Sequence, residues 1–128
     1  MQHETKNLFN NNMKNILVIG STGQIGSELV RELRSIYGGN NVVAGFIKGA
    51  EPTGELLEGG PSAECDVTNP EMITAVVKKY NIDTIYNLAA LLSVVAEGKP
   101  RLAWKIGIDG LWNILEIARE NNCAVFTP

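Results

Sequence analysis

The 128-residue chain is poor in the residues that build metal centres and disulfide frameworks. It contains two cysteines, Cys65 and Cys123, and a single histidine, His3, which lies in a polar N-terminal stretch. Thiol and imidazole groups this few and this scattered predict two reduced cysteines in apolar segments, and no structural metal.

The chain also lacks a long apolar run. The longest, residues 88–96, is far below the roughly 20 residues that a membrane-spanning helix needs. Residues 1–13 are polar and Asn-rich, without the apolar centre of a secretory signal. We therefore expect a cytoplasmic protein without membrane contact, in which residues 1–13 form a disordered arm.

An excess of positive charge is absent as well. Eleven basic residues face fourteen acidic ones, which gives a net charge of −3. Nucleic-acid binding needs a basic surface, so no nucleic-acid partner is expected. The apolar content of 45% and the charged content of 20% are ordinary for one globular domain, which we place at residues 14–128.

Short apolar runs alternate with helical patterns along this domain. The predicted strands are residues 15–20, 41–46, 63–65, 83–90 and 123–126. Helices are predicted after the first, third and fourth strands, whereas residues 47–62 are rich in Gly and Pro and predict a surface loop with room for one short helical turn. This alternation predicts an α/β fold, a Rossmann-type parallel sheet of about five strands in the order 3-2-1-4-5 with helices on both faces.

The helical patterns also predict buried faces and caps. The first helix is expected to bury Ile25, Leu29, Leu33 and Ile36 and to end at a left-handed Gly38. Asn69, Pro70, Lys78 and Lys79 suit the two ends of the second helix. A long helix over residues 99–121 is expected to turn Trp104, Ile108, Leu111, Leu115 and Ala118 toward the core, with Trp112 and Ile114 as additional apolar surface.

The stretch after the first strand carries the chemical signal. Gly20, Gly23 and Gly26 form a G-x-x-G-x-x-G pattern between a strand and a helix. Gly20 permits a sharp turn, Gly23 lets the backbone approach a pyrophosphate, and Gly26 lets the helix pack closely. The helix N-terminus then offers N–H groups to phosphates, with contacts expected from Thr22, Gln24 and Ile25. The pattern predicts a dinucleotide site, the alternative being a tight turn without ligand.

Two later segments support a dinucleotide. Asp66, followed by Val67, ends the third strand, where a carboxylate can accept from the adenine amino group or merely cap the next turn. Leu88, Ala89 and Ala90 end the fourth strand, where small residues leave room for the nicotinamide side or simply pack a turn.

The acid that usually ends the second strand and binds the adenosine ribose is missing, because Phe46 occupies its position and Lys48 follows. The expected cofactor is NAD. NADP stays open, with Lys48 on the 2′-phosphate, as do weak cofactor binding and a merely solvated Lys48.

With these motifs and the long helix, residues 14–128 resemble the extended short-chain dehydrogenase/reductase superfamily, the NAD-dependent epimerase/dehydratase group. The string Leu91-Leu92-Ser93, Ala96-Glu97, Pro100 and Ala103-Trp104 is similar to the short-chain type of L-threonine 3-dehydrogenase. This resemblance implies hydride transfer from the threonine β-carbon to nicotinamide, with Ser93 near the amino-acid substrate and Leu92 near the nicotinamide.

The chain departs from that family in the catalytic residues. Gly107 stands where the family usually has an Asn of its proton relay. The Tyr-x-x-x-Lys pair is absent, because Asn41, Thr84 and Ala90 lie four positions after the three tyrosines. We expect no catalytic residue here, and a chain that stops before the catalytic Ser and Tyr segments and is inactive alone.

Two alternatives stay open. One is a fragment of a nucleotide-sugar epimerase or dehydratase, and the other is a non-catalytic dinucleotide-binding or interaction module. In the superfamily the long helix often builds a dimer interface, and an open fifth-strand edge invites pairing. The expected assembly is a homodimer or larger.

Overall fold

The computed structural model of the chain describes residues 13–89, 98 and 100–128. Its five strands form one parallel sheet in the order β3-β2-β1-β4-β5. They are β1 (Ile16–Ile19), β2 (Val42–Phe46), β3 (Ser62–Glu64), β4 (Thr84–Asn87) and β5 (Ala124–Phe126). The predicted α/β class and strand order are confirmed; the fourth strand, expected to reach residue 90, ends at Asn87.

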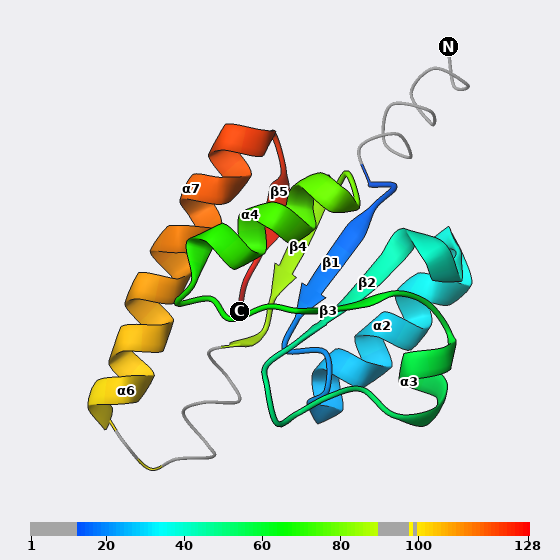
Figure 1. Cartoon of the computed structure of the whole chain (residues 1–128), viewed down its shortest axis with the longest axis horizontal. Helices are drawn as coiled ribbons and strands as arrows, with labels where there is room; N and C mark the ends of the chain where they lie inside the picture. The colour runs from blue at the N-terminus through cyan, green and yellow to red at the C-terminus, as the bar shows by residue number, and fades with distance from the viewer. Residues whose placement is uncertain (1–12, 90–97, 99) are drawn as a thin grey trace.

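Helices cover both faces of the sheet, as predicted. They are α2 (Gln24–Tyr37), α3 (Gly54–Glu58), α4 (Pro70–Lys79), α6 (Pro100–Lys105) and α7 (Leu111–Asn121), with a short 3₁₀ turn at Gly39–Asn41 and a π turn, η2, at Ile106–Gly110. Helices α4 and α7 lie on one side of the sheet, and α2 and α3 lie on the other (Figure 1). Helix α3 is the short helical turn within the predicted loop.

Strand β1 separates two apolar cores, because its side chains alternate between the faces of the sheet. Leu17 and Ile19 pack with α4 and α7, whereas Ile16 and Val18 pack with α2. All four side chains are completely buried. Each contributes about 1.5–3 kcal/mol by leaving water, so β1 is the centre of the fold.

Helix α2 buries a different face from the predicted one. Ile25 and Ile36 are 63% and 67% exposed, so their assignment to the core was wrong. Gly26, Val30 and Leu33 form the buried face instead, and Leu29 packs at its side. The buried face begins at a glycine, which a search for apolar side chains overlooks.

The ends of the first two helices follow their sequence signals in part. Asn69 Oδ1 accepts from the Met72 N–H at 3.2 Å, and Pro70 opens α4, so this predicted cap is confirmed. Gly38 has a φ of +99° but a ψ of 143°, which lies outside the left-handed helical region predicted for it. Its N–H still bonds to the Arg34 carbonyl at 2.9 Å and closes α2.

The predicted long helix is present as α6, η2 and α7, but its core-facing side was assigned wrongly. Gly110, Ile114, Ile117 and Ala118 are buried, so only Ala118 of the predicted stripe reaches the core. Four large apolar side chains point outward, and we call them the outer stripe: Trp104, Ile108, Trp112 and Leu115. Leu111 is half-buried, and Ile114, expected as surplus surface, is core.

A π turn lies within the outer stripe, between Trp104 and Trp112. It spans Ile106–Gly110 and is wider than a regular helical turn. The indoles of Trp104 and Trp112 are 72% and 65% exposed. The sequence pattern grouped Trp104, Ile108 and Leu115 on one stripe but turned that stripe toward the core instead of outward.

Both cysteines are free thiols, Cys65 buried and Cys123 half-buried. Within the residues that the structure describes, no three His, Cys, Asp or Glu side chains gather into a set that could ligate a metal. Of the helices in that part of the chain, none has the length and apolar character needed to span a bilayer.

Candidate functional site

The turn after β1 brings Gly20 and Gly26 into contact. Gly20 has a φ of +83°, which side-chain-bearing residues rarely adopt. A Cβ on Gly26 would lie 2.2 Å from the Gly20 carbonyl oxygen, and a Cβ on Gly20 would lie 3.0 Å from the Leu88 carbonyl carbon. Both positions therefore require glycine, which agrees with the turning and packing roles inferred from the pattern.

Gly23 is the N-cap of α2, with φ −74° and ψ 171°. Any residue can adopt this conformation, so backbone geometry alone does not explain a glycine here. Among the described residues no side chain caps the helix, and no acidic residue lies in its first turn. The first N–H groups of a helix have no partners within it, and Gln24 and Ile25 at this end are exposed. The uncapped positive end fits a pyrophosphate.

Ser21 and Gly45 join this turn to the end of β2, although the pattern singled out neither residue. The Gly45 carbonyl accepts from the N–H groups of Gly20 and Ser21 at 3.2 and 3.0 Å and from Ser21 Oγ at 2.8 Å. Ser21 is completely buried. The available signal was a small hydroxyl residue inside the glycine motif and a glycine just before the end of a predicted strand.

The end of β4 lies beside the glycine turn. The Leu88 N–H donates to the Ile19 carbonyl at 2.9 Å, and Ala89 is half-buried. Asn87, which the sequence did not single out, is buried, and its Oδ1 accepts from the Ala89 N–H at 3.4 Å. The carboxyl ends of β1 and β4 thus meet at the point where the strand order reverses, the usual ligand position of such sheets. The predicted positions Ala90, Leu92 and Ser93 lie outside the described residues.

The turn after β3 shows the local bond that one alternative gave Asp66. Its Oδ1 accepts from the Thr68 N–H at 2.9 Å and from the Thr68 hydroxyl at 2.7 Å. Asp66 therefore closes a local turn, as one alternative supposed. Its Oδ2 accepts no hydrogen bond from residues 13–89, 98 or 100–128. Val67 is buried, and its carbonyl accepts from Asn113 Nδ2 at 2.9 Å.

The end of β2 lacks a carboxylate on its last residue, the half-buried Phe46. Lys48 is exposed and makes no ion pair in the described part of the chain. Glu51 Oε1 accepts from the Gly49 N–H at 2.9 Å, and this bond lowers the pKa of the Glu51 carboxyl. The loop therefore presents one unpaired cation and one carboxylate engaged by its own backbone.

The parallel sheet, its strand order and the glycine turn at the reversal point define a Rossmann-like α/β protein. Residues 16–127 match the model of the NAD dependent epimerase/dehydratase family, and the chain belongs to this family. The predicted membership in the NAD-dependent epimerase/dehydratase group is confirmed.

Relatives and solved structures share most of this chain. An uncharacterized epimerase/dehydratase of Staphylococcus haemolyticus is 44% identical over 116 residues, which are 91% of this chain and 36% of the relative. The X-ray structure of L-threonine dehydrogenase from Clostridium difficile superposes with a TM-score of 0.79 at 47% identity, over 91% of this chain and 36% of that one. L-threonine dehydrogenase from Phytophthora infestans gives 0.77 at 36% identity, over 90% and 36%. The chain thus spans about 36% of these relatives' length.

Proposed function

We propose that this chain binds NAD and forms the cofactor-binding part of an oxidoreductase of the L-threonine 3-dehydrogenase type. The observation that carries the proposal is the contact of Gly26 with Gly20, where a Cβ would come within 2.2 Å of the carbonyl oxygen. Only glycines allow this turn, and the turn sets the uncapped end of α2 beside the reversal point of the sheet.

Each predicted contact has a place in this proposal. The pyrophosphate binds the N–H groups at the start of α2, next to Thr22, Gly23, Gln24 and Ile25. Asp66 accepts from the adenine amino group through Oδ2, with Val67 beside it, and the nicotinamide side lies against Leu88 and Ala89. Ala90 and Leu92 stay predicted contacts of the nicotinamide side and Ser93 a predicted substrate contact, and these positions lie outside the described residues. NAD, when bound, supplies the acceptor for a hydride.

Hydride transfer from the threonine β-carbon belongs to the longer protein in this proposal. The chain has no Tyr-x-x-x-Lys pair. Tyr86 stacks on Phe126 with ring centroids 4.9 Å apart, and burial raises the pKa of its hydroxyl. An acid/base tyrosine needs a lowered pKa. We therefore expect the 128 residues to bind cofactor in the cytoplasm without turning over threonine.

The choice between NAD and NADP rests on Phe46 and Lys48. The missing carboxylate removes repulsion of a 2′-phosphate, and the unpaired Lys48 is available to attract one. Binding of NAD and NADP is compared by calorimetry for the parent chain and for Lys48→Ala. A role for Lys48 predicts about tenfold weaker NADP binding and unchanged NAD binding in the variant. Tighter NAD binding that Lys48→Ala does not alter contradicts NADP preference.

We also propose that the chain self-associates through the outer stripe. Trp104, Ile108, Trp112 and Leu115 expose more apolar surface than a solvated helix needs. Arg101 and Lys105 flank one end of the stripe. Glu116 and Glu120 flank the other, where Arg119 also lies 3.0 Å from Glu116 and 3.8 Å from Glu120. Antiparallel pairing with a second copy sets Arg101 against Glu120 and Lys105 against Glu116. In the sequence, the midpoint between Arg101 and Glu120 and the midpoint between Lys105 and Glu116 both fall between Gly110 and Leu111. One antiparallel register therefore allows both charge pairs to form.

Two other functions make different predictions. A nucleotide-sugar epimerase or dehydratase binds NAD equally well, so the substrate is tested in a longer protein that includes these residues. A non-catalytic module binds a partner in a cofactor-dependent way and gains no activity from added segments. NADH formation from threonine and NAD by the longer protein supports the dehydrogenase. NADH formation by none of the longer forms contradicts it.

A further inference from the structure

We propose that Asn113 is a positioning residue for the adenine end of the dinucleotide. It lies on α7, outside the glycine turn, and its bond to Val67 holds the turn that carries Asp66. The inference rests on the proposed function, because it assumes that Asp66 accepts from the adenine amino group.

Helix α7 and its N-cap residue Gly110 touch the β3–α4 turn at two points. Asn113 Nδ2 donates to the Val67 carbonyl oxygen at 2.9 Å. One helical turn earlier, a Cβ on Gly110 would lie 2.6 Å from Val67 Cγ2, so the helix backbone approaches the Val67 side chain directly. Val67 is 4% exposed. The residue next to Asp66 is therefore held by a polar contact from α7 and by close packing from its N-cap residue, Gly110.

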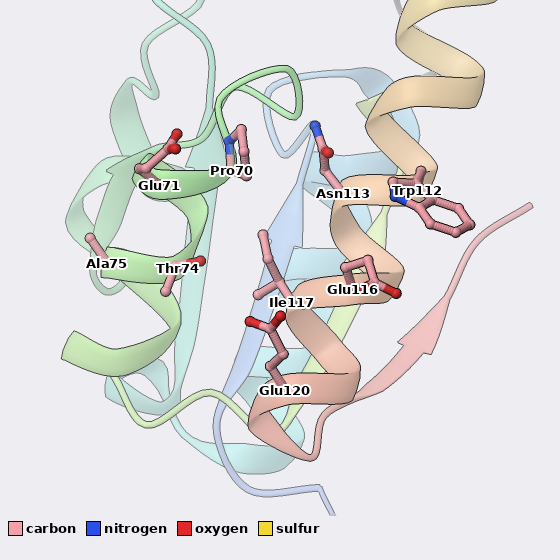
Figure 2. Close-up of a pocket in the computed structure, with 9 residues that line it drawn as sticks. All are labelled: Pro70, Glu71, Thr74, Ala75, Trp112, Asn113, Glu116, Ile117 and Glu120. Carbon is pink, nitrogen blue, oxygen red and sulfur yellow. The ribbon is translucent and has the colours of Figure 1, made fainter.

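The bonds within the turn fix Asp66 relative to α4, while the Cys65 N–H, just before it, donates to the Phe46 carbonyl at 2.7 Å and ties the start of the turn to β2. Asp66 Oδ1 binds Thr68, the Asn69 N–H donates to the Asp66 carbonyl at 2.9 Å, and Asn69 caps α4. These contacts move together if the turn shifts. The Asn113 bond is the directional link between the turn and the neighbouring helix, and Figure 2 shows this side chain extending toward the segment that leads into Pro70.

Loss of that link has a selective consequence. A hydrogen bond between a carboxylate and an amino group weakens steeply with distance and angle, so a small shift of the Asp66 turn costs recognition of the adenine amino group. The pyrophosphate binds at the start of α2, whose turn is held by Gly45 and Leu88. That contact does not depend on Asn113. Asn113 should therefore alter the preference between bases and leave the phosphate contribution unchanged.

The test compares NAD with nicotinamide hypoxanthine dinucleotide, which carries an oxygen where adenine carries its amino group. The parent chain should bind NAD about tenfold or more tightly than this analogue, the effect of one hydrogen bond to a charged group. Asn113→Ala and Asn113→Asp should reduce that ratio to about threefold or less, mainly through weaker NAD binding. Asn113→Asp keeps the side-chain size and replaces the donor with an acceptor.

The chain offers a matched control on the same helix. Asn121 Nδ2 donates to the Ile117 carbonyl at 2.8 Å within α7, so Asn121→Ala removes the same kind of bond away from the turn. It should keep the parent ratio. Circular dichroism and urea unfolding of every variant show that the chains compared are folded.

Each other outcome identifies what has failed. Equal weakening of both dinucleotides in the Asn113 variants means a general structural role and overturns the inference, as does an unchanged ratio. A parent chain that binds both dinucleotides equally overturns the role of Asp66 together with this inference, while cofactor binding stands. A folded parent chain that binds neither overturns the proposed function itself.

Discussion

The hydroxyl of Ser21 donates a 2.8 Å hydrogen bond to the carbonyl oxygen of Gly45. Both residues are buried, and the same oxygen accepts two backbone N–H groups of the glycine turn. This bond ties the turn after β1 to the end of β2, so the proposed pyrophosphate and ribose positions share one rigid support.

Replacing Ser21 with Ala should lower the free energy of unfolding by about 1 kcal/mol, the usual net value of an intramolecular hydrogen bond. Urea denaturation measures the change. Ser27→Ala is the control, because that hydroxyl bonds only to the Gln24 carbonyl within α2, at 3.2 Å. It should cost less than about 0.5 kcal/mol. Equal losses in the two variants would contradict a special role for Ser21.

Gly26→Ala tests the contact that carries the proposed function. The new Cβ would meet the Gly20 carbonyl at 2.2 Å, so the turn must shift. We expect a loss of about 1–3 kcal/mol in unfolding free energy, as for other overpacked sites, together with much weaker NAD binding.

Gly107→Ala is the matched control for Gly26→Ala. A Cβ at Gly107 meets nothing within 4 Å. Because alanine favours helix, the change should be neutral or stabilise by up to about 1 kcal/mol. A Gly26→Ala chain as stable as Gly107→Ala, and with parent affinity for NAD, would show that the turn tolerates a side chain.

The sheet was predictable because its signals are local. Four apolar residues at Ile16–Ile19, a glycine turn and an amphipathic helix follow one another directly in the sequence. Right-handed crossovers then leave few strand orders. The Asn69 cap was predictable for the same reason, since its partner Met72 lies three residues away.

The buried faces of the helices, and the hydrogen bonds between segments far apart in the sequence, were not predictable in this way. The core face of α2 begins at Gly26, which has no side chain to reveal it. A π turn interrupts the helix between Trp104 and Trp112, and no apolar periodicity announces that turn. Ser21 meets Gly45 across 24 positions, so the bond exists only once the sheet has formed. Asn113 meets Val67 in the same manner across 46 positions.

Cys65 gives the protein a defined sensitivity to alkali. Burial, with a smaller contribution from Glu64, raises the pKa of its thiol to about 12. The unfolded thiol ionises near pH 8.5. The contribution of the buried neutral thiol is therefore complete below about pH 8.5 and is lost as the pH rises toward 12, with a slope of about 1.4 kcal/mol per pH unit.

Urea unfolding from about pH 8 to pH 11 checks this slope, with Cys65→Ala as the reference. The difference between parent and variant isolates the thiol, because the other titrating groups are common to both. Parallel stability curves for the two chains would mean that Cys65 ionises equally easily when folded.

Trp112→Glu should dissociate the proposed assembly, because it sets a charge at the centre of the outer stripe. Sedimentation velocity measures the mass of each chain in solution. Arg101→Glu should weaken the parent dimer, and adding Glu120→Arg should restore it, since the two side chains are paired across copies in the proposed register. A monomeric parent chain at high concentration contradicts self-association, and failure of the double exchange contradicts the register.

Calorimetric titration of NAD into the folded 128-residue chain tests the central claim most directly. We predict saturable binding of one NAD per chain, a strong loss of that binding in Gly26→Ala, and no NADH formation when threonine is added. Cooperative urea unfolding of the same sample shows that the chain is folded. A folded chain that takes up no NAD at any concentration reached would contradict the proposal that these residues form a working cofactor site.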